Sequence, residues 1–386
     1  MKSQRPHILF VSRWYPDRHD PMPGLFVRRH AEAVALFADV TVLYVISDKT
    51  VPVGKKSIDI SEVNGIKEIR IYYGKSRFAL LNGLFQIWHY LRALQNIKKP
   101  DITHVHVLTR TAIPALWLKL TSGIPYYITE HWSRYLPDNI AKGSYKGWWR
   151  RRITERIVKY ASGVSTVTEN LAKAMRMTGL HNKKYSVIPN VADTDFFKPS
   201  AEVKKGNTTR FVHVSCFDEP AKNIKGIIDA FQSLIETKPE CVLYIVGDGP
   251  DYNAIFEYAN RTGLVDSKIH FTGLLEGPLL LDQMQNADAM VMFSNYENLP
   301  CTIVESICCG VPVISSDVGG IGEHVKGANG LLVPKGDLDS LKNAMLKVAI
   351  QELNCEKLQL HNYGLQYFSM KSVALDFMKF YNLNNK

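Results

Sequence analysis

The stretch that organises the chain runs from residue 296 to 310 and reads Tyr296-Glu297-Asn298-Leu299-Pro300-Cys301-Thr302-Ile303-Val304-Glu305-Ser306-Ile307-Cys308-Cys309-Gly310. Proline suits the first turn of a helix, so we expect a loop that enters a helix at Pro300 or Cys301. Gly310, with a proline two residues later, predicts the end of that helix. Residues 311–315 are a short apolar run, typical of a strand buried on both faces.

Two carboxylates bracket this element, Glu297 in the loop and Glu305 inside the helix, with seven residues between them. The backbone N–H groups of the first turn, in residues 301–303, form an anion site. A diphosphate bound there leaves Glu305 about one turn deeper, where a carboxylate accepts both hydroxyls of a ribose, and leaves Glu297 beside the attached sugar. The alternative is a chance pair of solvated glutamates. However, Glu305 lies between Val304 and Ile307, where an unpaired charge is costly.

Size and composition indicate an ordinary globular protein of two or three domains in 386 residues. Residues 1–195 hold 30 Lys and Arg against 15 Asp and Glu, a net +15, and residues 196–386 hold 17 against 22, a net −5. The basic half is expected to attract polyanions, which include nucleic acid, anionic lipid and phosphorylated substrates.

Cysteine usage and hydropathy predict a cytoplasmic location. The six cysteines lack metal-ligand spacing and are expected to be free thiols in a reducing compartment. The first apolar run is too short for a signal peptide, and no window reaches the eighteen apolar residues of a spanning helix.

Apolar runs and helical patterns alternate along both halves, which predicts an α/β protein with two doubly wound domains. The run 7–12 leads into a loop that ends at Gly24, where backbone amides could approach a phosphate, although G-x-G-x-x-G is missing. The run 126–129 opens into Glu130-His131-Trp132-Ser133-Arg134-Tyr135, at the carboxyl end of a strand. His131 could donate there to a sugar hydroxyl, and a purely structural histidine is the alternative. In the second half, Lys222 follows the strand 211–215 and could neutralise a diphosphate as a glycosidic bond breaks.

A basic and aromatic helix is expected over residues 145–159. Its cations alternate with apolar residues, and paired tryptophans suit an interfacial helix on anionic lipid. A solvated basic face is the alternative, and nucleic acid is disfavoured because we find no recognised nucleic-acid module. The membrane or acceptor candidates are Lys146, Trp148, Trp149, Arg150, Arg151 and Arg152.

Asp193-Thr194-Asp195 superficially matches a D-x-D metal motif, but it lies in the proline-bounded stretch 189–199. We interpret this stretch as a linker turn between the two domains.

The pair Glu297 and Glu305 resembles the E-x7-E signature of retaining glycosyltransferase family 4. Supporting matches, in order along the chain, are Trp14-Tyr15-Pro16, Gly24-Leu25-Phe26-Val27, Glu130-His131-Trp132-Ser133, Ile188-Pro189-Asn190, Lys222-Asn223, Gly247-Asp248-Gly249-Pro250 and Gly319-Gly320. The resemblance implies two Rossmann-like doubly wound domains facing across a cleft, the B-type glycosyltransferase architecture. The expected domains are residues 1–190, joined by a C-terminal helix of about 367–386, and residues 191–366.

The resemblance also implies roles for individual residues and no metal or other cofactor. Catalytic roles are expected for Glu297, His131 and Lys222, and donor-binding roles for Gly24, Glu305, Leu299, Pro300, Cys301, Thr302, Gly273, Leu274 and Gly249. Cys216 departs from the family pattern, because an arginine usually stands six residues before the lysine. Arg13 or Arg28 is the expected substitute.

The predicted function is retaining transfer of a sugar from a nucleotide-sugar donor to a glycan or lipid-linked acceptor in surface polysaccharide biosynthesis. The enzyme is expected on the inner face of the cell membrane, without nucleic acid as a partner. A sugar-nucleotide epimerase of the same architecture and a non-catalytic scaffold are the alternatives, and a nicotinamide dehydrogenase is disfavoured because the glycine fingerprint is missing.

Overall fold

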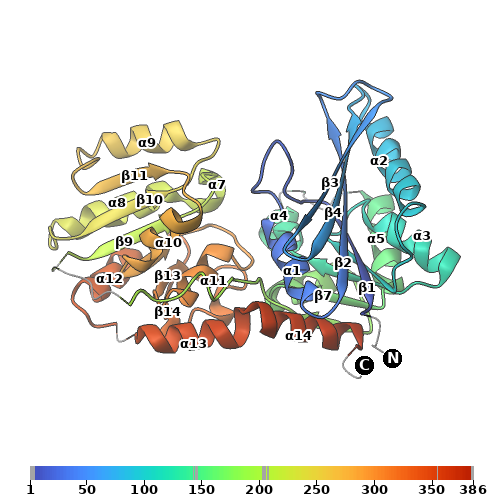
Figure 1. Ribbon diagram of the computed structural model, residues 1–386. Coiled ribbons are helices and arrows are strands. Elements are labelled where there is room, and N and C mark those ends of the chain that lie inside the picture. Colours follow the sequence, from blue (N-terminus) through green and yellow to red (C-terminus); the bar gives the residue numbers. More distant parts are fainter. Residues whose placement is uncertain are drawn as a thin grey trace. The chain divides into compact units, whose positions relative to one another are not determined.

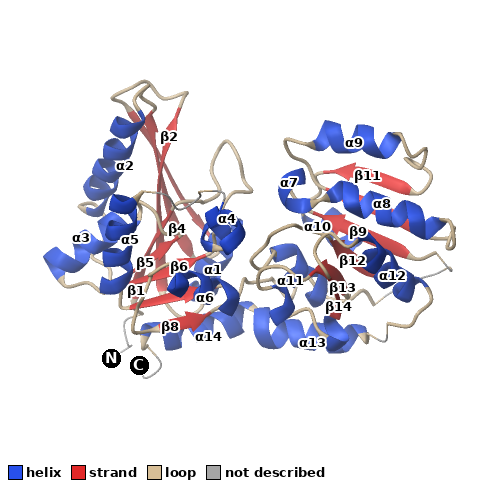
Figure 2. Ribbon diagram, turned by 180° about the vertical axis from the view of Figure 1, so that it is seen from behind, coloured by secondary structure: helices blue, strands red, loops and turns tan. Residues whose placement is uncertain are grey.

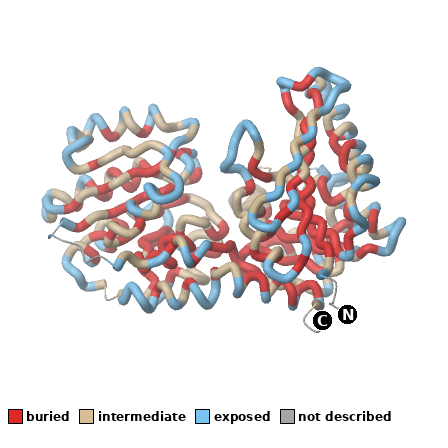
Figure 3. Tube along the Cα trace, in the orientation of Figure 1, coloured by how far each residue is buried: buried red, intermediate tan, exposed pale blue. Residues whose placement is uncertain are grey.

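The computed structural model describes residues 5–383 except 142, 144–146, 202–205, 207 and 354. The chain divides into two compact units, each described by itself below (Figure 1). The N-terminal unit comprises Met1–Val191 and Met370–Lys386, and the C-terminal unit comprises Ala192–Ser369. The expected domain boundaries, after residues 190 and 366, lie one and three residues from these divisions. Buried residues gather around the sheet of each unit (Figure 3).

The N-terminal unit is built on a sheet with the strand order β3-β4-β2-β1-β5-β6-β7-β8. All neighbours are parallel except the β3–β4 pair. Its strands are β1 (His7–Ser12), β2 (Asp39–Asp48), β3 (Lys56–Val63), β4 (Ile66–Gly74), β5 (Ile102–His106), β6 (Tyr126–Glu130), β7 (Gly163–Thr166) and β8 (Tyr185–Val187). Its helices are α1 (Leu25–Ala35), α2 (Ala79–Leu94), α3 (Ala112–Ser122), α4 (Pro137–Ala141), α5 (Trp148–Tyr160), α6 (Glu169–Met177) and α14 (Met370–Tyr381).

Alternate residues of β1 serve two separate cores in this unit, as a strand period of two requires. Ile8 and Phe10 pack with α1 and α14, and Leu9 and Val11 pack with residues of α2 and α3. The sheet is therefore covered on both faces. Figure 2 shows α2, α3 and α5 together on one flank.

The C-terminal unit contains a fully parallel sheet with the strand order β11-β10-β9-β12-β13-β14. Its strands are β9 (Arg210–Val214), β10 (Val242–Val246), β11 (Ile269–Gly273), β12 (Ala289–Met292), β13 (Val313–Ser316) and β14 (Gly330–Val333). Its helices are α7 (Glu219–Lys222), α8 (Ile224–Ile235), α9 (Tyr252–Asn260), α10 (Gly277–Gln285), α11 (Cys301–Cys308), α12 (Leu338–Ala349) and α13 (Lys357–Phe368). Both sheets, with helices on their faces, are Rossmann-like, so the predicted fold class is confirmed.

The predicted linker turn is present at Asp193, whose Oδ1 accepts hydrogen bonds of 3.1 Å from the backbone N–H groups of Asp195 and Phe196. Just before it, Ala192 forms a β-bridge with Ser369, the residue that separates α13 from α14. Within the described part of the chain, every helix falls short of the length and apolar character that a membrane-spanning helix needs.

Candidate active site

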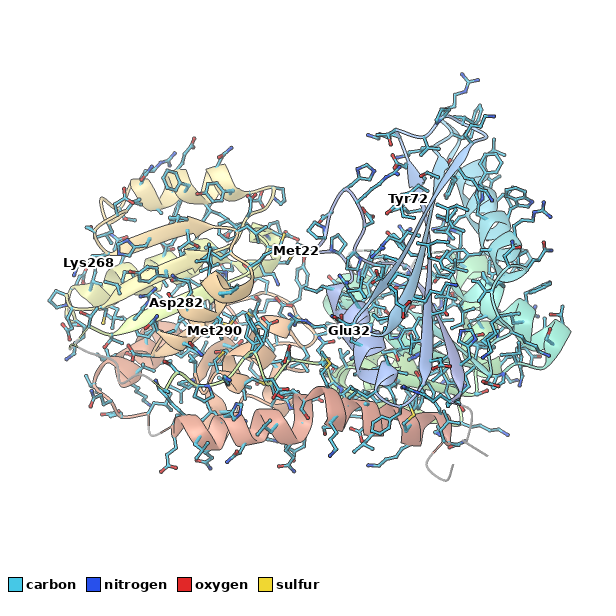
Figure 4. All side chains as sticks on the ribbon, viewed as in Figure 1. Met22, Glu32, Tyr72, Lys268, Asp282 and Met290 are labelled. Carbon is cyan, nitrogen blue, oxygen red and sulfur yellow. The ribbon has the colours of Figure 1, made fainter. Side chains whose placement is uncertain are left out.

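The order of strands in the C-terminal sheet defines where a ligand is expected to bind. From β9 the chain adds β10 and β11 on one side and β12, β13 and β14 on the other, so the order reverses between β9 and β12. The two strands are neighbours, and Met290 of β12, labelled in Figure 4, pairs with Val212 of β9. In open α/β sheets, ligands bind beyond the carboxyl ends of strands at this kind of reversal. Lys222 and Glu297 lie on the segments that follow these two strands.

Lys222 and Glu297, which are 75 residues apart in sequence, form a direct ion pair. The Lys222 ammonium donates to Glu297 Oε1, and the Ser294 hydroxyl donates to the same oxygen over 3.1 Å. The two segments are also joined through the backbone, because the N–H of Asn295 donates to the carbonyl of Ala221 at 2.7 Å. The structure thus brings two of the three predicted catalytic residues together.

The environment of Lys222 keeps it charged. Burial lowers the pKa of the ammonium, but the Glu297 carboxylate, together with Cys216 and Asp218, more than offsets this effect, so the net pKa is raised. The side chains of Lys222 and Glu297 are 18% and 13% exposed. A fixed charge pair shielded in this way can respond strongly to charge that develops next to it.

A glycine holds the Glu297 loop in place. Gly319 has φ +60°, and a Cβ on it would lie 1.8 Å from the carbonyl oxygen of Glu297. The neighbouring Gly320 N–H donates to the carbonyl of Asn298 at 3.1 Å. A side chain at position 319 would therefore push away the loop that carries Glu297.

The helix predicted after this loop is α11, which begins at Cys301 as expected, with extended backbone at Pro300. Pro300 at the N-cap makes no side-chain capping hydrogen bond. The first-turn amides, including those of Cys301 and Thr302, point away from the helix body and lack intrahelical acceptors by geometry. Glu305 is only 4% exposed and lies one turn further on. Leu299 is buried directly before the proline.

The other residues predicted to bind the donor within this unit lie at the carboxyl ends of neighbouring strands. Gly249, after β10, packs against the backbone of Phe217, where a Cβ would lie 2.6 Å from its nitrogen. Gly273 ends β11 with φ +71° and open space around it, and Leu274 is exposed. The Gly273 carbonyl accepts from the N–H of Gly247 at 2.9 Å, which ties the two loops together.

In the N-terminal unit, the predicted residue His131 follows β6 and contacts the end of β5. A hydrogen bond of 3.2 Å joins the Nε2 of His131 to the Nδ1 of His106. The buried Glu130 carboxylate accepts from the backbone N–H groups of His131, Trp132 and Leu108, each at 2.9 Å. Glu130 therefore ties the loop after β6 to the loop after β5.

Two histidines that the sequence analysis did not single out, His30 and His106, surround His131. The ring of His30 lies 5.2 Å from that of His131 and 5.7 Å from that of His106. Burial lowers the pKa of His30 to about 4 and places the pKa values of His106 and His131 well below their ordinary value. His131 is therefore neutral near pH 7 and can offer an N–H or a lone pair to a sugar hydroxyl. The alternation Thr103-His104-Val105-His106 in a buried strand was the signal in the sequence.

The same three histidines form the group of potential metal ligands found in the described part of the chain, with their ligand nitrogens all within 4.8 Å of one another. Neutral imidazoles are good ligands for zinc and similar ions. This grouping includes His131, so an ion bound there would occupy the nitrogen face expected to meet the sugar.

Gly24 stands at the N-cap of α1 with φ +74°, and a Cβ on it would lie 2.3 Å from the carbonyl carbon of Trp14. Of the two arginines considered as substitutes at Cys216, Arg28 is engaged within its own unit, since its Nε lies 3.3 Å from Glu68 and 3.5 Å from Glu32. Cys216 itself is exposed.

The predicted membrane helix corresponds to α5. Lys146 lies outside the described residues, and the others are on the helix. Trp148 and Trp149 stack with their ring centroids 3.8 Å apart and are 63% and 65% exposed. Arg150, Arg151 and Arg152 follow directly, also exposed.

The buried histidines predict that stability falls in mild acid. Burial lowers the pKa of His30, His213 and His324 to about 4. Their contribution to the free energy of unfolding is complete above the pKa of about 6.5 that a histidine has in the unfolded chain, and it is lost as the pH falls towards 4. At pH 5 each buried histidine lowers the free energy of unfolding by about 2 kcal/mol relative to neutral pH. Glu130 and Glu219 partly counter this loss, because burial raises the pKa of both carboxyl groups.

We therefore expect a clearly lower melting temperature at pH 5 than at pH 7.5, measured by calorimetry. The variant His213→Gln should lose part of this pH dependence while the remaining histidines retain theirs. An unchanged melting temperature between the two pH values would contradict the neutral state of these side chains.

Comparison with known proteins identifies the family of the chain. Residues 28–196 match the family model described as Glycosyltransferase Family 4, and residues 208–350 match Glycosyl transferases group 1. The chain is 30% identical over 303 residues to 2-deoxystreptamine N-acetyl-D-glucosaminyltransferase of Streptomyces fradiae, covering 70% of this chain and 69% of that protein. The chain belongs to glycosyltransferase family 4.

Two further matches of this family 4 chain are more distant. It is 26% identical over 196 residues to lipopolysaccharide 1,6-galactosyltransferase of Escherichia coli, covering 49% of this chain and 53% of that protein, so it spans about half of that relative's length. A solved structure of Anabaena HepE in complex with UDP and glucose superposes with a TM-score of 0.73 at 16% identity, covering 98% of this chain and all of that one. The chain is therefore a glycosyltransferase of the B-type fold.

Proposed function

We propose that this glycosyltransferase moves a sugar from a nucleotide-sugar donor to a glycan or lipid-linked acceptor with retention at the anomeric carbon. The observation that carries the proposal is the Lys222–Glu297 pair at the strand reversal of the C-terminal sheet. Glu297 lies in the loop that leads into α11, where Pro300 stands at the N-cap. Anabaena HepE, which shares the fold, was solved with UDP and glucose, and this supports a nucleotide-sugar as the donor.

In this proposal the donor diphosphate binds at the first-turn amides of α11, in residues 301–303, next to Leu299 and Pro300. Glu305 accepts the ribose hydroxyls, and Gly273 and Leu274 lie by the base. Gly249, and separately Gly24 in the N-terminal unit, each lack a side chain that would keep a phosphate from the backbone. Lys222 releases part of its contact with Glu297 and neutralises the leaving diphosphate.

The proposed reaction is attack from the face that the leaving group occupies. The bond between the anomeric carbon and the diphosphate oxygen breaks, and an acceptor hydroxyl oxygen bonds to the same face of that carbon. The acceptor proton passes to the departing phosphate oxygen. Glu297 holds hydroxyls of the transferred sugar, and His131 offers its neutral imidazole to a sugar hydroxyl. No metal is required in this scheme, because Lys222 and the helix amides supply the positive charge.

For the acceptor we propose a growing surface polysaccharide at the inner face of a membrane. The lipopolysaccharide galactosyltransferase among the relatives supports this class of acceptor. The helix α5 supports contact with anionic lipid, because stacked exposed tryptophans adjoin three arginines. Nucleic acid is not proposed as a partner.

The test is a panel of nucleotide-sugars screened by thermal stabilisation and followed by product analysis. A donor at a hundred times its Kd adds about 2.7 kcal/mol to the stability of the native state, so the melting temperature should rise by about 5–10 °C. Sugar that appears on an acceptor with the donor's anomeric configuration supports the proposal. An isomerised nucleotide-sugar without an acceptor would favour the epimerase, and stabilisation without any turnover would favour the scaffold.

A further inference from the structure

A cavity of about 400 Å³ lies between α2 and the β3–β4 hairpin in the N-terminal unit. Its lining combines the turn before β3, the end of β4 and one side of α2, namely Gly54, Lys55, Tyr73, Gly74, Leu84, Phe85, Trp88 and His89. The volume lies within the range of small-molecule sites, and most of the lining is apolar or aromatic. None of these residues has a role in the transfer reaction proposed above.

The cavity has a rigid floor and rim. The Tyr73 ring stacks on His89 at 5.2 Å, and the Tyr73 hydroxyl donates to the carbonyl of Asn82 at 2.8 Å. The rim turn is fixed to the strand, because the N–H of Gly74 donates to the carbonyl of Lys55 at 3.1 Å. A Cβ on Gly74 would lie 2.0 Å from the Pro52 carbonyl oxygen, so the turn approaches the strand as closely as glycine allows. The cavity is thus preformed.

The mouth of the cavity lies on an unusually apolar flank of this unit. Leu84 and Trp88 line the cavity and are 55% and 52% exposed. Figures 1 and 2 both show α2, α3 and α5 side by side on this flank. The other large exposed apolar side chains on these helices are Leu80, Leu81, Trp117, Leu120, Trp148, Trp149, Ile153 and Tyr160. Large apolar side chains exposed on neighbouring helices are typical of an interaction site.

The charge of the same flank identifies the partner. The helices α2, α3 and α5 contain seven Arg and Lys residues and one acidic residue, Glu155, which lies 4.0 Å from Arg151. At the cavity, Lys55 lines the rim, and the Arg92 guanidinium lies 5.7 Å from the Trp88 ring. Exposed tryptophans among cations suit the interface of an anionic bilayer. A surface that binds a protein would be expected to have a polar rim and no marked excess of positive charge.

We propose that this cavity binds one hydrocarbon chain of an anionic membrane lipid, with the headgroup phosphate on Lys55. The bound hydrocarbon chain would anchor the flank formed by α2, α3 and α5 to the bilayer. This inference extends the membrane contact in the proposed function from one helix to three and adds a specific lipid site. It also assigns a lipid-binding role to Trp88 and Leu84 of α2, which the sequence analysis did not single out.

The test is calorimetric titration of the full chain with hexyl, octyl and decyl phosphate below their micelle concentrations. We expect one saturable site whose affinity rises about fourfold for each added methylene until the cavity is filled. Leu84→Trp should weaken decyl phosphate binding at least tenfold by filling the mouth. The matched control Leu80→Trp, on the same helix and outside the lining, should bind within twofold of the wild type. Lys55→Ala should bind about fivefold more weakly with the same dependence on chain length.

Equal affinity for hexyl and decyl phosphate, or undiminished binding by Leu84→Trp, would overturn the inference. Both substituted leucines are more than half exposed, so the variants are expected to fold. The titration uses no sugar donor. A protein that fails to transfer sugar can therefore still bind the alkyl phosphates, and a protein that does not bind them can still transfer sugar, so the two proposals fail separately.

Discussion

Replacing Glu297 by glutamine is expected to lower the rate of sugar transfer by about two to three orders of magnitude, with little change in the affinity for free nucleoside diphosphate. The change keeps the shape of the side chain and removes its charge. In the free protein Glu297 holds the Lys222 ammonium and accepts from Ser294. The amide offers the sugar and the lysine a neutral partner, so the loss should appear mainly in kcat. Initial rates and equilibrium binding of the nucleotide measure the two effects separately.

The control for this variant is Glu276→Gln, an exposed glutamate of the same unit directly before α10. Its rate should match the wild type within experimental error. A Glu297→Gln enzyme that transfers sugar at the normal rate would show that this carboxylate lies away from the reacting sugar.

Replacing Lys222 by methionine is expected to lower transfer at least a hundredfold and also to weaken nucleoside diphosphate binding. Methionine keeps most of the buried length of the side chain but removes the cation. Unlike the Glu297 variant, it leaves a carboxylate that repels the phosphates, so both kcat and Kd should suffer. The matched control is Lys225→Met, three residues further along in α8, whose ammonium lies over the Tyr258 ring at 5.3 Å.

The double variant Lys222→Met with Glu297→Gln tests whether the two residues act as one unit. Residues in direct contact give non-additive effects. We expect the double variant to be no slower than the slower single variant and to recover nucleotide affinity relative to Lys222→Met. Strictly additive losses would mean that the two side chains act independently.

Much of the fold followed from local patterns in the sequence. The strand His7–Ser12 has the predicted bounds because an unbroken apolar run defines it, and α11 begins at Cys301, one of the two predicted positions. No element was expected at β3 or α6. The residues of β3 alternate between exposed and half-buried on the outer edge of the sheet, so the strand has no buried face that an apolar pattern could reveal.

The site was predictable in its parts and not in its connections. Sequence spacing singled out Glu297 and Glu305, but the sequence analysis placed Lys222 at the diphosphate and Glu297 beside the sugar and did not predict their contact. Only the neighbouring positions of β9 and β12 bring these two side chains into contact. His30 and His106 were missed because a histidine in a buried element looks like core until the ring it contacts is known. The need for glycine at position 319 likewise depends on a loop distant in sequence.

The most direct test of the account is a crystal structure of the full chain with the nucleoside diphosphate that stabilises it most. We predict phosphate oxygens within about 2.7–3.2 Å of the backbone nitrogens of residues 301–303, with the ribose hydroxyls on the Glu305 carboxylate. A nucleotide bound elsewhere, with Glu297 and Glu305 both out of its reach, would contradict the assignment of this element as the donor site.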